Sequence, residues 1–342
     1  MWDGKLIVIL VITLSIVSSV VFALSSQELW SSNAEITESQ PQDLATYQQQ
    51  VKQFQPVFNI YQDDGTVLVS KELDELVDSS LLFQRFVDTF NSSNNKRKFL
   101  DNSDEFNDFK KSLFVDSSEM TEGSIRALYS QWSERITASV SDKKNRNSPY
   151  VISFQTMTQK DSFDLLVAYI VDTESKVRQD AFNNLQAVVN GKRNELIQQK
   201  RILETQAKNK LVVETERAKY AMDIAKAAGV EKPIQVGNNS ELFGIDLGAK
   251  GLQAKVQALE SVKNLSVIEP RLQQIDAKLN MLNNLEIDRS VDFQTFRYIE
   301  NAEQPVTRDK PKRALIVILG TFLGGMLGVA IVIIRFMFRK DY

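Results

Sequence analysis

An uncharged apolar run covers residues 314–334, near the end of the chain. As an α-helix, its 21 residues would reach about 30 Å, the thickness of the hydrocarbon core of a bilayer. A second apolar run covers residues 6–24 and could serve either as a membrane helix or as a signal peptide. Its length exceeds the roughly 7 to 15 residues of a signal-peptide core, so we expect a retained anchor. The chain is therefore predicted to cross a membrane twice.

The charges beside the first run predict its orientation. Lys5 precedes the run, whereas Glu28, Glu35 and Glu38 follow it, so the positive-inside rule places the N-terminus in the cytoplasm. A second crossing returns the C-terminus to the same side. The predicted organisation is a short cytoplasmic segment at residues 1–5, a transmembrane helix at 6–24, a periplasmic domain at 25–313, a second transmembrane helix at 314–334 and a cytoplasmic tail at 335–342.

The composition excludes several classes of function. The chain has no cysteine and no histidine, which removes thiolate nucleophiles, imidazole bases and the usual zinc ligands. A formal net charge of −3 and a pI near 5.4 give no basic footprint for nucleic acid. The sequence also contains no GxxxxGK[ST], GxSxG or HExxH motif. We expect a protein that is not an enzyme, with no metal, cofactor or nucleic-acid partner.

Three segments alternate apolar and polar residues as half-buried β-strands do: WSSNAEIT at 30–37, PYVISFQTM at 149–157 and SVDFQTFRYI at 290–299. The first follows the N-terminal apolar run, and the third precedes the C-terminal one. If these two pair, they form a sheet close to the bilayer and bring the membrane helices side by side. The expected fold class is an α+β membrane protein, with two transmembrane helices flanking a periplasmic α/β base and a very long, coiled-coil-like helical extension.

Helices are predicted between these strands. Residues 70–90 have apolar side chains near helical spacing, with Ser70 as the N-cap. A much longer helix is predicted from about residue 161 to 228, with Asp161 as its N-cap and Gly229 at its end. A helix of that length would span about 100 Å, which is far more than a compact domain requires.

One narrow apolar stripe follows the long helix at close to 3.6 residues per turn. The other faces carry charged and amide side chains, so the stripe must pack against another element to be stable in water. Two partners are possible: the apolar positions of the return segment, residues 252–282, or another copy of the protein. The candidate packing residues are Leu185, Val189, Leu196, Leu203, Leu211 and Met222.

Glycines and prolines mark the C-terminal region. Gly320, Gly324 and Gly328 recur every four residues, so they share one face of the second membrane helix and would let another helix approach closely. Pro305 and Pro311 bracket VTRDK and prevent a continuous helix there, which predicts a semi-rigid collar. The basic residues of this collar would meet either lipid headgroups or a membrane partner.

The ending EQPVTRDKPKRALIVILGTFLGGMLG resembles the proline-rich and glycine-rich second transmembrane region of the Wzz-type chain-length determinants, which are polysaccharide co-polymerases. Three further stretches are similar to that family: LWSSNAEIT, FVDTFNSSNNKRKFL and LGAKGLQAKVQALES. The resemblance covers essentially the whole chain. It departs at the start, because family members usually carry a cytoplasmic stretch before the first span, whereas this chain begins at MWDGK. That departure fits a start assigned inside a longer frame.

The resemblance implies a function that composition cannot give. Family members are bacterial inner-membrane proteins whose periplasmic domains associate into a ring. This homo-oligomer sets the modal number of repeat units that a Wzy-type polymerase adds to a lipid-linked polysaccharide, and its members have no catalytic residues of their own. The resemblance links the long helix and residues 247–261 to ring building. It links a second set to length control: Pro305, Pro311, Gly320, Gly324 and Gly328.

Several alternatives stay open. The favoured glycan is lipopolysaccharide O-antigen, and enterobacterial common antigen or capsular polysaccharide is the runner-up. From other classes, the chain could be a two-span membrane receptor or a structural coiled-coil protein, although only residues 335–342 follow the second span. A fused co-polymerase and tyrosine kinase would need a phosphate-binding loop, which the sequence lacks.

Overall fold

The computed structural model describes residues 2–62, 64–113, 121–142, 144–145, 148–234 and 243–339. The chain divides into two units, each with its own packed elements. Unit 1 contains residues 1–45, 78–180 and 292–342, and unit 2 contains residues 46–77 and 181–291. Met1 and the tail residues 340–342, which belong to the predicted cytoplasmic ends, lie outside the described residues.

Unit 1 is built on a four-stranded antiparallel sheet in the order β4-β5-β1-β6. Its strands are β1 (Trp30–Glu38), β4 (Ile136–Val140), β5 (Tyr150–Thr156) and β6 (Phe296–Glu300). In β1, Ile36 is opposite Tyr150 on one side and Tyr298 on the other. The three predicted strands are confirmed, the third only over Phe296–Glu300 of the predicted 290–299. The first and third also pair, which is the condition set for a sheet that brings the terminal helices together. The edge strand β4 was not predicted, although its five residues, ITASV, alternate apolar and polar side chains.

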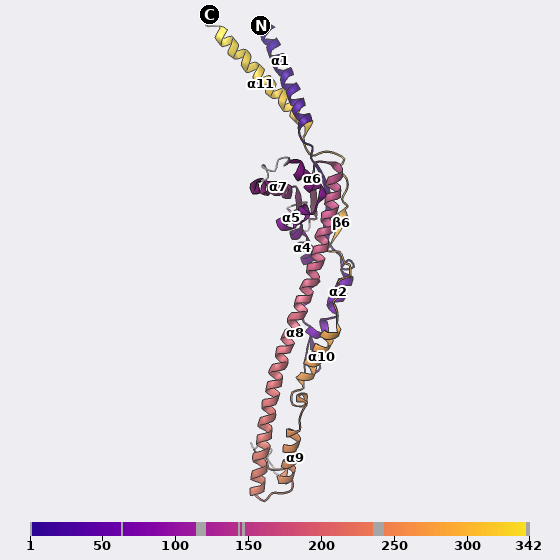
Figure 1. Cartoon of the computed structure of the whole chain (residues 1–342), viewed down its shortest axis with the longest axis vertical. Helices are drawn as coiled ribbons and strands as arrows, with labels where there is room; N and C mark the ends of the chain where they lie inside the picture. Colours follow the sequence, from indigo (N-terminus) through magenta and orange to yellow (C-terminus); the bar gives the residue numbers. More distant parts are fainter. Residues whose placement is uncertain are drawn as a thin grey trace. The chain divides into compact units, whose positions relative to one another are not determined.

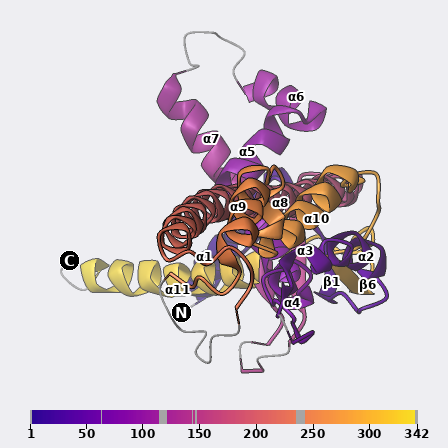
Figure 2. The ribbon, with the colours of Figure 1, turned by 90° about the horizontal axis from the view of Figure 1, so that it is seen from below.

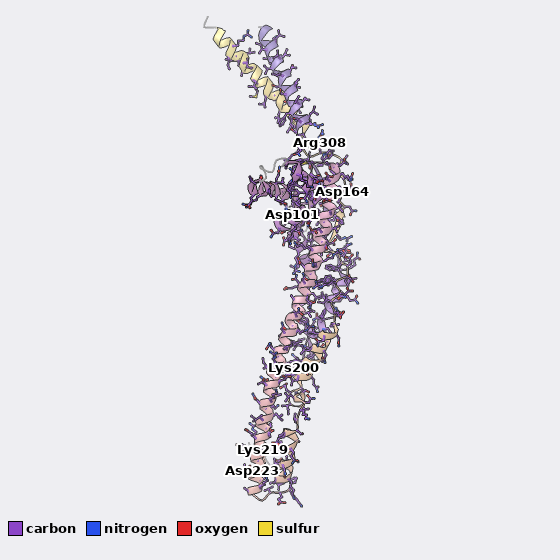
Figure 3. All side chains as sticks on the ribbon, viewed as in Figure 1. Asp101, Asp164, Lys200, Lys219, Asp223 and Arg308 are labelled. Carbon is purple, nitrogen blue, oxygen red and sulfur yellow. The ribbon has the colours of Figure 1, made fainter. Side chains whose placement is uncertain are left out.

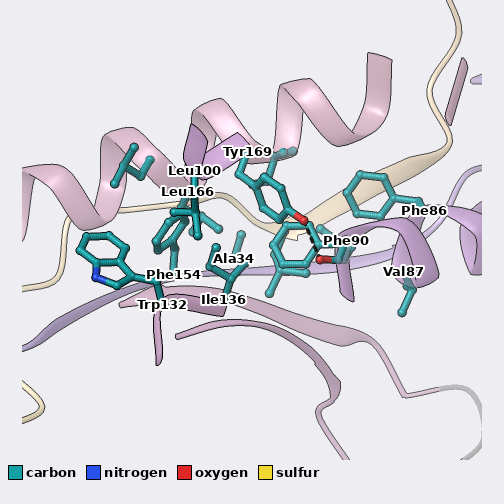
Figure 4. Close-up of a cluster of buried hydrophobic side chains, with 14 of the residues drawn as sticks. Ala34, Phe86, Val87, Phe90, Leu100, Trp132, Ile136, Phe154, Leu166 and Tyr169 are labelled. Carbon is teal, nitrogen blue, oxygen red and sulfur yellow. Dashed lines mark hydrogen bonds between the residues drawn. The ribbon is translucent and has the colours of Figure 1, made fainter. Parts of the chain in front are cut away.

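Helices of unit 1 complete its hydrophobic core. They are α4 (Ser79–Asn91), α5 (Ser93–Asp101), α6 (Asp104–Leu113), α7 (Glu122–Glu134) and the first turns of α8 (Gln159–Ala227). Aromatic rings fill the space between sheet and helices, and the Tyr169 hydroxyl donates to the Phe90 carbonyl at 2.8 Å (Figure 4). The buried set includes Ala34, Ile36, Phe86, Phe90, Phe154, Leu166 and Tyr169.

The start of α4 differs from the prediction. Its N-cap is Asp78, whose side chain accepts the Leu81 N–H at 3.0 Å. The prediction of Ser70 as the N-cap is wrong, because the chain between them forms only the short 3₁₀ helix η1 (Asp74–Leu76). The hydrogen bond from Leu81 to Asp78 therefore fixes where the helix begins, although apolar residues at helical spacing continue toward Ser70.

The long helix α8 has 69 residues and continues from unit 1 into unit 2. Thr158 caps it, since its hydroxyl accepts the Asp161 N–H at 3.0 Å, so the prediction of Asp161 as the N-cap is wrong by three positions. Its end is confirmed at Gly229, which has a φ of 71°, a value that glycine adopts without strain.

Unit 2 places shorter elements along its part of α8. They are α2 (Ala45–Lys52), α3 (Gln55–Phe58), β2 (Ile60–Tyr61), β3 (Val67–Leu68), α9 (Gly248–Glu260), η2 (Leu265–Val267) and α10 (Arg271–Asn284). The return helices α9 and α10 lie beside α8 in both views (Figures 1 and 2). Ion pairs cross these contacts: Lys200 meets Asp276 of α10 and Lys219 meets Glu260 of α9, each at 2.6 Å (Figure 3).

Two terminal helices, α1 (Trp2–Ser25) and α11 (Arg313–Arg339), are joined to unit 1. The segments Lys5–Ser25 and Arg313–Arg335 are long and apolar enough to cross a membrane. They pack against each other, which agrees with the expectation that pairing of β1 and β6 brings them side by side. The observed fold is therefore the predicted α+β class, with a long helix and two terminal apolar helices.

Candidate functional site

The face of α11 that carries the glycine repeat packs against α1. A β-carbon added to Gly320 would lie 2.7 Å from Cβ of Ser19, and one added to Gly324 would lie 2.6 Å from Cβ of Ser15. At Gly328 the nearest atom would be Cα of Val8, at 3.1 Å. Real β-carbons essentially never come as close as the contacts at Gly320 and Gly324, and the one at Gly328 is tighter than most. Glycine therefore permits the antiparallel contact between the two helices.

Gly325 differs from the other three glycines. A β-carbon there would meet only Cδ1 of Ile12, at 4.0 Å, which is an ordinary van der Waals distance. The spacing of the glycines predicts a packing face but not its partner. Ser15 and Ser19 were missed, although they repeat at the same interval of four as the glycines. Ser19 donates to the Ser15 carbonyl at 2.8 Å, so its hydroxyl is satisfied within α1.

The predicted collar lies alongside the entry to β1. Asp309 donates its N–H to the Leu29 carbonyl at 2.9 Å, and the Leu29 N–H donates to the Lys310 carbonyl at 3.0 Å. Further along, the Ser32 hydroxyl donates to the Glu303 carbonyl at 2.7 Å. Pro305 and Pro311 lie within this non-helical segment, and α11 begins only at Arg313. The two connections between sheet and apolar helices therefore support each other.

An ion cluster joins these two connections. A single oxygen of Glu28, Oε1, accepts from Nη1 of Arg308 and from Nη2 of Arg313, both at 2.8 Å. Nε of Arg313 also donates to the Ala23 carbonyl of α1 at 3.3 Å. Arg308 lies at the junction of the sheet with the apolar helices (Figure 3). This cluster was not predicted, because no local pattern connects Glu28 with Arg308, 280 positions later in the sequence.

A second group of charges ties α8 to the chain that enters β6. Burial raises the pKa of Glu174 above its ordinary value, and the charge of Arg178 and the backbone N–H of Thr295 lower it in part. Arg178 also forms an ion pair with Asp292. Burial, with a smaller contribution from Glu174, raises the pKa of Tyr298. This group connects α8 to β6, the strand that continues into the collar.

The predicted stripe on α8 is covered within the same chain. Leu185, Val189, Leu196 and Leu203 are buried, and Leu211 and Met222 are half-buried. The return segment lies along this part of α8: Arg193 donates to the Leu282 carbonyl of α10 at 2.9 Å. Near the end of α8, Met222 packs against a cluster formed by Ala221, Ala225, Ala249 and Leu252. A role of these residues in oligomer formation stays a prediction.

The arrangement is suited to packing and anchoring. Among the described residues, no group of three or more Asp, Glu, His or Cys side chains could hold a metal ion. The structure instead brings together three features: the packed helices α1 and α11, the collar hydrogen-bonded to the entry of β1, and the Glu28 carboxylate shared by two arginines. Their combined effect is to hold the two terminal helices against one sheet.

Two family models match the chain. The model described as "Chain length determinant protein" matches residues 1–81, and the one described as "G-rich domain on putative tyrosine kinase" matches residues 271–337. The second match covers α10, β6, the collar and most of α11. Together the two models include both terminal helices and both segments that connect them to the sheet.

Relatives match over nearly the whole chain. "Ferric enterobactin transport protein FepE" of Escherichia coli K12 is 26% identical, over 98% of this chain and 86% of its own length. "Chain length determinant protein" of the same organism is 25% identical, over 99% of this chain and 91% of its own. "ECA polysaccharide chain length modulation protein", also from Escherichia coli K12, is 33% identical over 116 residues, which are 33% of this chain and 31% of its own length.

A solved structure shares the fold. The structure titled "full-length bacterial polysaccharide co-polymerase" superimposes with a TM-score of 0.64 and 23% identity. The match covers 99% of this chain and 96% of that one. The likeness therefore includes both units and both terminal helices.

Proposed function

Since the chain belongs to the Wzz-type family of chain-length determinants and polysaccharide co-polymerases, we propose that it sets the modal length of lipopolysaccharide O-antigen. It does so as a homo-oligomeric scaffold beside a Wzy-type polymerase, acting on a lipid-linked polysaccharide. Members of this family are regulators of chain length, and the protein is not a catalytic enzyme. Its terminal helices and large folded body fit an inner-membrane protein with a periplasmic bulk, and we propose that both termini are cytoplasmic.

The observation that carries this proposal is the closed connection between the terminal helices and the sheet. The glycine face of α11 packs on α1, and the collar pairs with the entry to β1. A body fixed at both ends has little freedom to tilt relative to its membrane helices. Such a body can hold neighbouring copies and a membrane polymerase in a fixed arrangement, which length control by a scaffold requires.

A second apolar row on α8 supports the homo-oligomer. Ile202, Val213, Tyr220 and Ile224 are spaced by 11, 7 and 4 residues, which places them on one face of the helix. Their exposed fractions are 57%, 45%, 59% and 45% within the described chain. The return segment covers the neighbouring stripe instead. An apolar row this exposed among the described residues fits contact with a second copy, although the Tyr220 ring also contacts that of Phe243.

The alternative glycans are enterobacterial common antigen and capsular polysaccharide. The name of one relative, matched over 116 residues, refers to modulation of enterobacterial common antigen. The proposed scaffold serves any of these glycans equally well, because none of its packing residues selects a sugar. The receptor and the structural coiled-coil protein make a different prediction, since neither requires any change in a surface polysaccharide.

The test is a lipopolysaccharide gel from the source bacterium with the gene deleted and then restored. We expect deletion to replace a clustered band pattern by a decaying ladder of short chains, and restoration to return the cluster. Parallel gels for common antigen and capsule assign the glycan if the O-antigen ladder is unchanged. Three unchanged patterns would contradict chain-length control and favour the receptor or structural alternative.

A further inference from the structure

We propose that the collar binds the phosphate-bearing headgroup of an anionic membrane lipid. The site consists of Arg308, Lys310, Lys312 and Arg313, at the end of the helix pair that adjoins the sheet. The inference requires that α1 and α11 span a membrane, as proposed above. It does not require that the protein regulates chain length.

The first support is an excess of positive charge that the structure leaves in place. Arg308 and Arg313 share one carboxylate oxygen of Glu28, so two guanidinium charges face a single negative charge. Each guanidinium has five N–H donors, and these contacts use only some of them. The shared carboxylate therefore holds the two arginines in position without neutralising them.

The second support is that the carboxylate of Asp309 is already engaged by the sheet. Asp309 lies between the basic residues in sequence, but its Oδ2 accepts from Nε2 of Gln155 at 2.8 Å and from the Ser31 hydroxyl. It is therefore held by the sheet. Lys310 and Lys312 are exposed, and no carboxylate of a described residue lies within 4.0 Å of either ammonium group. Two flanking cations are thus free for an external anion.

The third support is the position of this charge along α11. Arg313 is the first residue of the helix, and residues 314–334 carry no charge. In a bilayer the collar would therefore lie at the level of the lipid headgroups, and the apolar helices α1 and α11 would lie in the hydrocarbon core. Guanidinium groups bind phosphate oxygens through two parallel N–H donors, and ammonium groups attract the phosphate as point positive charges. A lipid phosphate meets both requirements, because its hydrocarbon chains can lie along α1 and α11.

The test uses the full-length protein, purified in detergent and titrated with lipid by native mass spectrometry. The probes are phosphatidylglycerol and the zwitterionic phosphatidylcholine. We expect the wild type to prefer phosphatidylglycerol. The double variant Lys310→Gln/Lys312→Gln should bind it roughly 25-fold more weakly, at about fivefold for each lost charge. The variant Lys310→Arg/Lys312→Arg should keep the preference.

Two further variants keep the proposal falsifiable. Lys52→Gln/Lys71→Gln removes two exposed lysines elsewhere, so it matches the loss of charge and should not change binding. Glu28→Gln removes the negative charge that the arginines share but keeps an amide oxygen that can accept from both. We therefore expect about fivefold tighter binding, a gain that a misfolded protein would not show. Equal affinity for both lipids, or a loss of the same size in the Lys52/Lys71 variant, would overturn the site.

A competition experiment separates a lipid from a free anion. Inorganic phosphate at millimolar concentration should displace little phosphatidylglycerol, because the lipid also contacts the apolar helices. Complete displacement would assign the collar to a soluble phosphate and contradict the lipid proposal. These measurements involve neither polymerase nor glycan, so their failure leaves chain-length control intact, and a failed gel experiment leaves this site intact.

Discussion

Gly324 of α11 lies directly over Ser15 of α1, with room for a hydrogen but not for a methyl group. A β-carbon at position 324 would stand 2.6 Å from Cβ of Ser15 and 2.7 Å from its Oγ. The glycine repeat, which the sequence offered as a surface for some other helix, is thus occupied by the first helix of the same chain. Any partner of α11 in the membrane must approach a different face.

We predict that Gly324→Leu separates α1 from α11 and broadens the glycan length distribution. Overpacking of this kind costs about 1–3 kcal/mol, and the displaced helices would loosen the collar. The measurement is the band pattern on a lipopolysaccharide gel at matched protein levels. Gly325→Leu is the matched control, because a β-carbon at position 325 meets only Ile12, at 4.0 Å. Equal broadening in both variants would argue against a role for the α1 contact.

The buried stripe on α8 should contribute most of the stability of unit 2. Leu196→Ala removes a side chain that is 2% exposed, and we expect a loss of about 2–4 kcal/mol in the free energy of unfolding. Val212→Ala, on an exposed face of the same helix and outside the apolar row that contains Ile202, should cost about 0.5 kcal/mol or less. Chemical denaturation of the purified protein provides the comparison. Similar losses would mean that the return segment does not protect Leu196.

The exposed row on α8 should control association between copies. Val213→Asp combined with Tyr220→Asp places two charges on this row, and we expect at least a tenfold weaker oligomer with the protomer still folded. Mass photometry in detergent measures the distribution of oligomers. Lys208→Asp changes an exposed position on another face of α8 and should leave assembly unchanged. An intact oligomer in the double variant would exclude this row as the interface.

Glu174 should make unit 1 less stable as the pH rises. Its folded-state pKa is raised by burial, so between the ordinary carboxyl value and the raised one the folded protein binds more protons than the unfolded chain. Stability therefore falls as pH increases through that window and is flat above it. Glu174→Gln should remove this fall, which thermal unfolding between pH 4 and pH 8 can detect. The exposed Glu216→Gln is the control, and an unchanged pH dependence in Glu174→Gln would contradict the assignment.

Features with a local chemical cause could be predicted from the sequence. The terminal apolar helices follow from uncharged runs, the end of α8 from Gly229, and the strands β1, β5 and β6 from alternation. The caps were placed wrongly at Ser70 and Asp161, since several nearby hydroxyls and carboxylates could serve and packing selects among them. Partners across long separations were out of reach. The spacing of the glycines defines a face of α11 but does not identify the helix that covers it. The residues around Glu28 likewise do not indicate that it pairs with Arg308 and Arg313.

The pairing of β1 with β6 also has a consequence for how the protein is made. Residues 30–38 leave the ribosome early, yet one edge of that strand stays open until residues 296–300 follow. An unpaired edge invites wrong partners, and closure over so long a stretch of chain is slow. Because α11 begins 13 residues after β6 ends, the sheet is completed only when synthesis of the chain has nearly reached the second apolar helix. The last step of folding thus coincides with synthesis of the last helix, and a copy stalled before that point would expose an open strand edge to wrong partners.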